Sequence, residues 1–129
     1  MPHVPLRAVL DGNGNVQIQG NGGAQLGRGS GAHVFTFALD DQTSLGVTFR
    51  DPAQGMIQAE DNGAGCPPAS NNSTQIDNVR RPTPTTAQFR DKNDNQQVDM
   101  PVSYMLHFDC AGDGNQNPTF DPIIINGGN

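Results

Sequence analysis

The feature that most limits the fold of this chain is a strict alternation of side chains in short runs. The clearest run covers residues 102–110. One face of it carries Val102, Tyr104, Leu106, Phe108 and Cys110, and the other carries Ser103, Met105, His107 and Asp109. Successive side chains of a β-strand point to opposite faces, so this period of two predicts a strand with one buried face.

Similar short runs recur along the whole sequence and are separated by residues that form turns. They begin at Val4, Val16, His33, Leu45, Met56, Ile76, Thr85 and Ile123. The chain has 16 Gly and 10 Pro, which favour turns and are poor occupants of helix interiors. We therefore expect about seven to nine short strands and no helix. Residues 20–31, GNGGAQLGRGSG, offer little to bury and predict a mobile loop.

Length and strand pattern together predict the fold class. The 129 residues fit a single domain that spans 1–129. Short alternating strands over about 100 to 130 residues predict an all-β, Greek-key, two-sheet β-sandwich. This pattern resembles the immunoglobulin-like superfamily, and Tyr104 stands where such folds often keep a corner tyrosine. The Cys–Trp–Cys signature of antibody domains is missing, because the chain has no Trp.

The last strand predicted from the sequence carries a second resemblance. Residues 120–126, FDPIIIN, resemble the tails of small uncharacterised bacterial β proteins. Neither this resemblance nor the immunoglobulin-like one implies an active site on these residues.

The charge of the chain argues against two classes of partner. The formal net charge is −6, Lys92 is the one lysine, and the arginines are scattered apart from Arg80 and Arg81. Binding to nucleic acid or to anionic membranes usually needs a basic face, which this sequence does not predict. A membrane-spanning helix needs about 18 or more apolar residues in a row, and no such run occurs, so no membrane insertion is expected.

The compartment stays open at this point. The first residues, MPHVPLRAVLDG, lack an apolar stretch long enough for a signal peptide. We therefore expect a soluble protein that is either cytoplasmic or the processed form of an exported one.

One loop has the composition of a calcium site. Asp91, Asn93, Asn95 and Asp99 lie at odd-numbered positions of a single stretch. Calcium binds several oxygen ligands, which Asp and Asn side chains supply. The spacing therefore predicts a calcium site at these four residues, and no other cofactor is expected.

Ordinary turn chemistry is the alternative for the same loop. Two shorter stretches, 11–15 and 113–117, share the Asp-x-Asn-x-Asn spacing. Residue 96, the sixth position of the loop, is Gln where an EF-hand has Gly, and the loop also lacks the Glu at position 12. Asp, Asn and Gly are common turn formers, and turns explain all three stretches with one cause.

The two cysteines leave two alternatives. Cys110 falls on the apolar face of its predicted strand, and Cys66 lies in a proline-rich loop. A Cys66–Cys110 disulfide would contribute up to about 4 kcal/mol. Equally, Cys110 could be a buried free thiol that behaves as a small hydrophobe.

No catalytic motif is found, and no catalytic residue is assigned. The glycines of residues 20–31 form neither a G-x-G-x-x-G fingerprint nor a G-K-[ST] motif, and G-x-S-x-G is absent. The leading hypothesis is a non-enzymatic binding or self-assembling module that meets a protein partner, or a second copy, through loops or edge strands. The alternatives are a calcium-dependent adhesive or carbohydrate-binding module and a small hydrolase that uses Asp and His.

Overall fold

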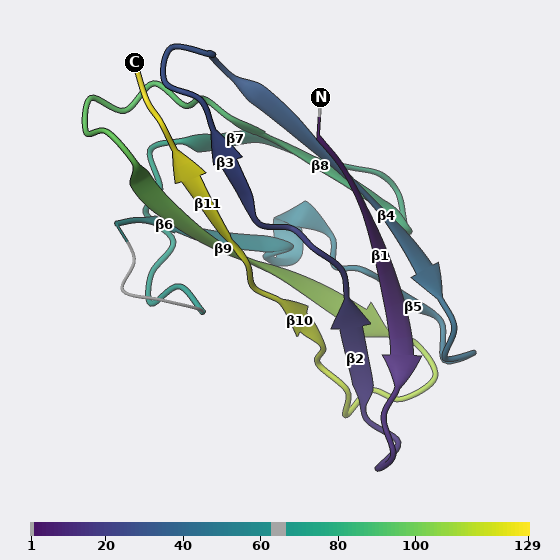
Figure 1. Ribbon diagram of the computed structural model, residues 1–129. Coiled ribbons are helices and arrows are strands. Elements are labelled where there is room, and N and C mark those ends of the chain that lie inside the picture. Colours follow the sequence, from purple (N-terminus) through teal and green to yellow (C-terminus); the bar gives the residue numbers. More distant parts are fainter. Residues whose placement is uncertain (1, 63–66) are drawn as a thin grey trace.

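The computed structural model describes residues 2–62 and 67–129, and its regular secondary structure consists almost entirely of β-strands (Figure 1). The strands are β1 (His3–Leu10), β2 (Val16–Gln19), β3 (Ala24–Leu26), β4 (His33–Asp41), β5 (Val47–Phe49), β6 (Ile57–Asp61), β7 (Ile76–Thr83), β8 (Thr86–Asp91), β9 (Met100–Cys110), β10 (Thr119–Phe120) and β11 (Ile123–Asn126). A single turn of 3-10 helix, η1 (Pro52–Gln54), follows β5. The all-β prediction is confirmed, and within the described residues no helix is long and apolar enough to span a membrane.

The first sheet has the strand order β2-β1-β4-β8-β7. Its neighbouring strands are antiparallel except for β1 and β4, which run parallel. On β8, Ala87, Phe89 and Asp91 share the buried face, as strict alternation requires. β7 lies at the sheet edge, where its proline, Pro82, is tolerated because it leaves no central ladder bond unmade.

The second sheet is organised around β9, its longest strand, with 11 residues. Along one side of β9 lie β5 and β6, placed end to end, and along the other side lie β10 and β11. β3 adds to β11 in parallel, so both sheets of the protein are mixed. Alternation in the sequence indicated the faces of these strands but not their partners.

The two sheets face each other across one shared core. The Tyr104 ring of β9 lies 5.1 Å from the Phe89 ring of β8 and 6.1 Å from the Phe37 ring of β4, both edge-on. The Tyr104 hydroxyl donates a hydrogen bond to the Gly22 carbonyl at 2.8 Å. A corner tyrosine bonds the backbone only a few residues upstream. Tyr104 instead fixes the segment between β2 and β3.

The glycine-rich stretch is more ordered than its composition predicts, and the prediction of a loop is wrong for Ala24–Leu26. These residues form β3, and the Leu26 side chain is buried. Gly22 enters the core so closely that an added Cβ would lie 2.4 Å from the Tyr104 hydroxyl. The strand arises from pairing with β11, a distant segment, and therefore leaves no local signal.

Candidate functional site

Five buried polar residues gather where β8 ends, and we call them the Asp91 cluster: Gln75, Asp91, Asn93, Asn95 and Asn126. Asp91 is at its centre and is fully buried. Its Oδ1 accepts hydrogen bonds from the Asn93 backbone N–H at 3.0 Å and from Asn126 Nδ2 at 2.7 Å. Its Oδ2 is buried and has no hydrogen-bond partner among the described residues.

Asn126, the last residue of β11, was missed at the sequence level. The inward face of β11 carries Ile124 and then Asn126, so a polar side chain occupies an apolar position. That break in the pattern is the signal that could have identified it. Asn126 Nδ2 donates to Asp91 and lies 3.5 Å from Gln75 Oε1, whereas Asn126 Oδ1 is buried without a partner in the part of the chain described.

Gln75 was missed for a different reason, since it lies in a polar loop before β7. Its side chain is only 4 % exposed, and its Oε1 accepts a hydrogen bond from the Asp94 N–H at 3.0 Å. Gln75 thereby joins the start of β7 to the loop that follows β8. No local pattern marks a glutamine of this kind as buried.

Asn93 connects three segments of the chain. Its backbone is left-handed, with φ 49°, a conformation that Asn adopts more readily than most residues. Nδ2 donates to the carbonyls of Gly27 and Gly31, at 3.1 and 3.2 Å, and to Ser30 Oγ at 3.2 Å. Oδ1 accepts from the Gly128 N–H at 2.9 Å. The side chain is therefore occupied in holding loops together.

The other two residues of the predicted calcium site lie in contrasting environments. Asn95 is buried, and its Nδ2 donates to the carbonyls of Gln97 and Asn126. Asn95 Oδ1 has no partner in the described parts of the chain. Asp99 is exposed, in a left-handed turn with φ 56° before β9. The structure thus brings together three of the four predicted residues and leaves Asp99 in solvent.

The cluster places a carboxylate in an environment that opposes its charge. Burial raises the pKa of Asp91, and the hydrogen bonds from Asn126 and Asn93 offset only part of this increase. The nearby Asp61 carboxylate raises that pKa further, whereas His33 lowers it. None of the ion pairs among the described residues includes Asp91.

The donor set of the cluster is one carboxylate surrounded by amides. Across residues 2–62 and 67–129, no three or more His, Cys, Asp or Glu side chains are grouped so that they could hold a metal ion. Amide and backbone oxygens are nevertheless ligands for hard cations such as calcium. Any cation bound here would therefore depend on Asp91 for its one charged ligand.

Comparisons with known proteins assign no family to this chain. No family model, no curated protein and no solved structure matches it. The chemistry of the Asp91 cluster is therefore derived from its own residues.

A serine–histidine pair lies beside the cluster. Ser30 Oγ and His33 Nε2 are 3.0 Å apart, and His33 is in register with Asp91 across β4 and β8. The single hydroxyl proton of Ser30 is donated to the Gly27 carbonyl at 2.7 Å. His33 Nε2 must then donate to Ser30, which is the reverse of what a general base does for a serine nucleophile. The pair stabilises the turn before β4.

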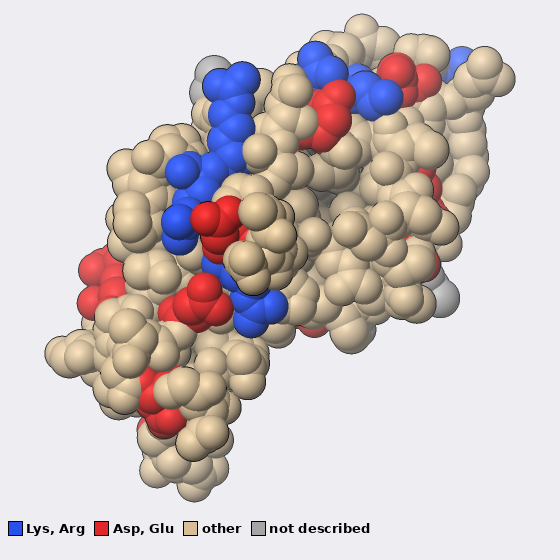
Figure 2. All heavy atoms as spheres, turned by 180° about the vertical axis from the view of Figure 1, so that it is seen from behind, with Lys and Arg blue, Asp and Glu red and all other residues tan. Residues whose placement is uncertain are grey.

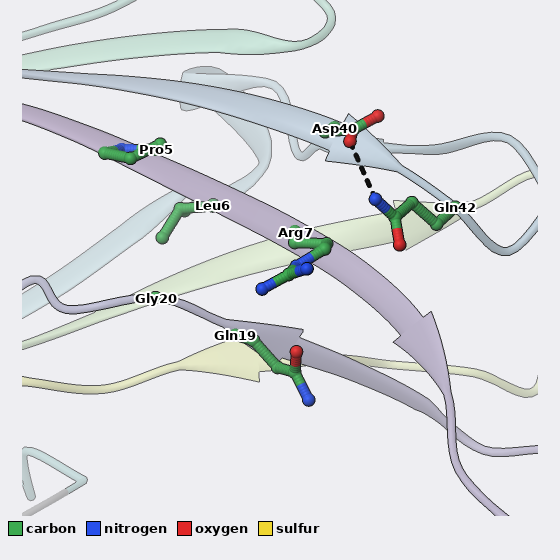
Figure 3. Close-up of a pocket in the computed structure, with 7 residues that line it drawn as sticks. All are labelled: Pro5, Leu6, Arg7, Gln19, Gly20, Asp40 and Gln42. Carbon is green, nitrogen blue, oxygen red and sulfur yellow. Dashed lines mark hydrogen bonds between the residues drawn. The ribbon is translucent and has the colours of Figure 1, made fainter.

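The outer face of the first sheet carries two shallow hollows. One of about 280 Å³ is lined by Pro5, Leu6, Arg7, Gln19, Gly20, Asp40 and Gln42 (Figure 3). The other, of about 300 Å³, is lined by Val34, Asn78, Arg80, Gln88, Phe89 and Arg90. Both have a mixed polar and apolar lining and open onto the sheet surface, and neither contains a buried reactive group.

Basic side chains on the face drawn in Figure 2 are interleaved with acidic ones. Ion pairs join Arg50 to Asp109 at 3.2 Å and Arg81 to Asp51 at 3.7 Å. Arg90 Nε and Nη2 donate to the two carboxylate oxygens of Asp77, at 2.7 and 2.5 Å, and these hydrogen bonds lower the pKa of Asp77. Three of the seven Lys and Arg side chains are thus balanced by a neighbouring carboxylate.

Cys110, the last residue of β9, is buried, and its Sγ lies 3.7 Å from the Leu45 carbonyl oxygen. Cys66 lies outside the described residues. The Cys66–Cys110 disulfide therefore stays a prediction.

Proposed function

We propose that this protein is a non-enzymatic binding module that meets a protein partner with the loops around the Asp91 cluster. The observation that carries the proposal is the joining of four segments by buried side chains. Asn93 holds the β3–β4 loop and Gly128, Gln75 holds the start of β7, and Asn126 holds the end of β11. Loops that are already fixed lose less entropy when they bind.

We infer that the two sheets form an immunoglobulin-like Greek-key sandwich, a fold in which loops gather at the two ends. Support comes from strand order. The sequence β4-β8-β7 matches strands B, E and D of that fold, and β5/β6, then β9, then β10/β11 match C, F and G. The protein departs from it in the parallel pairing of β1 with β4 and in the added strand β2.

Two of the sheet edges, those of β7 and β6, favour loops over strand addition as the route to a partner. β7 is irregular, with register shifts between Asp77 and Thr83. The edge of β6 is covered, because the Ala59 N–H donates to Asn71 Oδ1 and the Ala59 carbonyl accepts from the Ser73 N–H, both at 3.0 Å. Irregular and covered edges discourage pairing with another chain.

The end of the molecule that carries the Asp91 cluster also presents an exposed apolar side chain within a polar surface. Among the described residues, the large hydrophobic side chains that are exposed are Val98, at 47 %, and Leu10, at 46 %. Val98 lies in the β8–β9 loop beside exposed Gln96 and Gln97. Leu10 ends β1, at the opposite end of the molecule (Figure 1). A single apolar anchor with a polar rim is typical of a small protein–protein interface.

The test compares the two ends of the molecule. A photoreactive amino acid is placed at Gln96 in one variant and at exposed Asn13 in a second, and each is irradiated in extract from the source cells. We expect discrete cross-linked proteins from position 96 alone, reduced by Val98→Ser and unchanged by Leu10→Ser. Equal cross-linking from both ends, or none from position 96, would contradict the proposal.

A further inference from the structure

The Asp91 cluster holds three buried oxygen atoms without a hydrogen-bond partner within the described residues: Asp91 Oδ2, Asn126 Oδ1 and Asn95 Oδ1. All three are acceptors. Native proteins satisfy nearly all buried polar atoms, so three unsatisfied acceptors in one cluster need an explanation. The neighbouring Nδ2 atoms of Asn126 and Asn95 already donate, and exchanging nitrogen for oxygen in Asn126 would break its 2.7 Å bond to Asp91.

The unsatisfied atoms belong to groups that already touch. Asp91 and Asn126 are joined by a hydrogen bond through their other polar atoms, and Asn95 donates to the Asn126 carbonyl at 3.5 Å. These residues come from β8, β11 and the loop after β8, so the site is assembled by the fold. The stretch 91–99 alone does not form it.

Two titratable side chains act on the charge of Asp91, the carboxylate of Asp61 and the imidazole of His33. Asp61 lies close enough to affect Asp91, and it accepts hydrogen bonds from Ser73 Oγ at 2.6 Å and from the Thr74 N–H at 2.8 Å. These donors to Asp61 are neutral groups. None of the ion pairs among the described residues includes Asp91, and a buried carboxylate without an ion-pair partner is costly, which favours a cation over a neutral donor.

We propose that the Asp91 cluster binds one calcium ion, with Asp91 Oδ2 and Asn126 Oδ1 as its protein ligands and Asn95 Oδ1 as a third. Calcium accepts carboxylate, amide and water oxygens in irregular geometry, whereas magnesium requires a near-ideal octahedron. Asn93, whose oxygen is taken by Gly128, and exposed Asp99 are not ligands. The proposal is independent of the partner that the loops bind.

A single charged ligand implies weak binding. We expect a Kd of about 10⁻⁴ to 10⁻³ M, the range of weak calcium modules. At 10 mM CaCl2, mass action should then raise the melting temperature by about 3 °C or more, and EDTA should reverse the shift. Titration calorimetry of the full chain with CaCl2 should give one site per molecule.

Variants separate the site from the turns that resemble it. Asp91→Asn removes the charge at constant shape, and it should fold and lose the calcium shift. Matched controls are Asp11→Asn and Asp113→Asn, which alter exposed stretches of the same spacing, and Asp99→Asn; all three should keep the shift. Asn126→Asp adds a second carboxylate, so it should be less stable without calcium and show a larger calcium shift than the parent protein.

Four outcomes would overturn the proposal. These are no shift and no heat of binding at 10 mM CaCl2, a shift that survives in Asp91→Asn, an equal shift with MgCl2 or NaCl at matched ionic strength, and an Asn126→Asp protein whose calcium shift is no larger than that of the parent. Since Asn126→Asp is expected to gain affinity, it keeps the proposal testable even where Asp91→Asn fails to fold.

Discussion

Residues 11–15 and 91–95 have the same Asp-x-Asn-x-Asn spacing and lie in opposite environments. Both begin with the same turn, because the Asp Oδ1 accepts the backbone N–H two residues later, at 2.8 Å for Asn13 and 3.0 Å for Asn93. Asn13 and Asn15 are exposed, whereas Asn93 and Asn95 are buried. The local spacing thus determines the turn, and the rest of the fold determines what the side chains meet.

The difference follows from what each stretch connects. Residues 11–15 join two neighbouring antiparallel strands, β1 and β2, as the tip of a hairpin. Residues 92–99 cross from β8 in the first sheet to β9 in the second, and the end of β11 packs beneath them. A connection between sheets passes over the core, so the polar side chains that it buries, Asn93 and Asn95, need partners inside the protein.

The largest expected difference between the two stretches is in the stability lost on removing an asparagine. Asn93→Ala removes the side-chain hydrogen bonds to the Gly31 carbonyl and the Gly128 N–H and one of several to the Gly27 carbonyl, and should cost about 3 kcal/mol or more. Asn13→Ala should cost no more than about 0.5 kcal/mol. Urea unfolding of both variants measures this.

An additional variant, Asn93→Gly, separates the backbone from the side chain. Glycine adopts the left-handed conformation freely, so the variant keeps the turn and removes the hydrogen bonds. It should still lose most of the stability that Asn93→Ala loses. Near-parental stability of Asn93→Gly would mean that the backbone conformation, and not the network, distinguishes the two stretches.

The pH dependence of stability should show a smaller effect that is specific to the buried stretch. Because the folded pKa of Asp91 is raised, its stabilising contribution is fully present below the unfolded pKa of 3.8 and is lost as pH rises through the folded pKa. In EDTA, the free energy of unfolding of Asp91→Asn, measured relative to that of the parent protein, should therefore increase as pH rises from about 4 to 7.

Asp77 provides the control of opposite sign. Its pKa is lowered, chiefly by hydrogen bonds from Arg90, so its contribution is present above 3.8 and lost as pH falls through the lower folded pKa. Asp77→Asn should therefore be less stable than the parent protein at neutral pH, and the two stabilities should become equal in acid. Urea unfolding across this pH range checks both signs, and a gain for Asp91→Asn that does not change with pH would contradict the burial argument.

The smallest change in stability is expected for Asp99, at the end of the stretch 91–99. Asp99→Asn alters an exposed side chain, and Asn tolerates the left-handed backbone at this position, so stability should change by less than about 0.5 kcal/mol. Thermal and urea unfolding measure it. A loss of stability comparable to that of Asn93→Ala would mean that Asp99 belongs to the buried hydrogen-bond network, and would contradict its placement in solvent.

Alternation predicted most of the strands because it depends only on neighbouring residues. Residues 102–110 fall within β9, and the run that begins at Val4 lies within β1. β3 and β10 were missed because they have three and two residues and are defined by distant partners. Parallel pairing of β1 with β4 also has no local signal, since alternation gives the faces of a strand and not its neighbours.

The candidate site could be predicted only in part, for the same reason. Spacing identified Asp91, and alternation with Ala87 and Phe89 indicates that its side chain is buried. Its partner Asn126 lies 35 residues further along the chain and meets it only when β11 docks beside β9. The contact depends on the assembled sheets, which short-range patterns do not describe.

The pairing of β3 with β11 has a consequence for the order in which the protein is made. Ala24 aligns with Ile124 in this parallel ladder, so the second sheet cannot close until residues 123–126 have left the ribosome. Until then β3 lacks its ladder, part of β9 is open, and Asp91 lacks Asn126. Domains dominated by such long-range pairings fold in about milliseconds to seconds, which leaves a newly made chain with unpaired strand edges within reach of chaperones and of other chains.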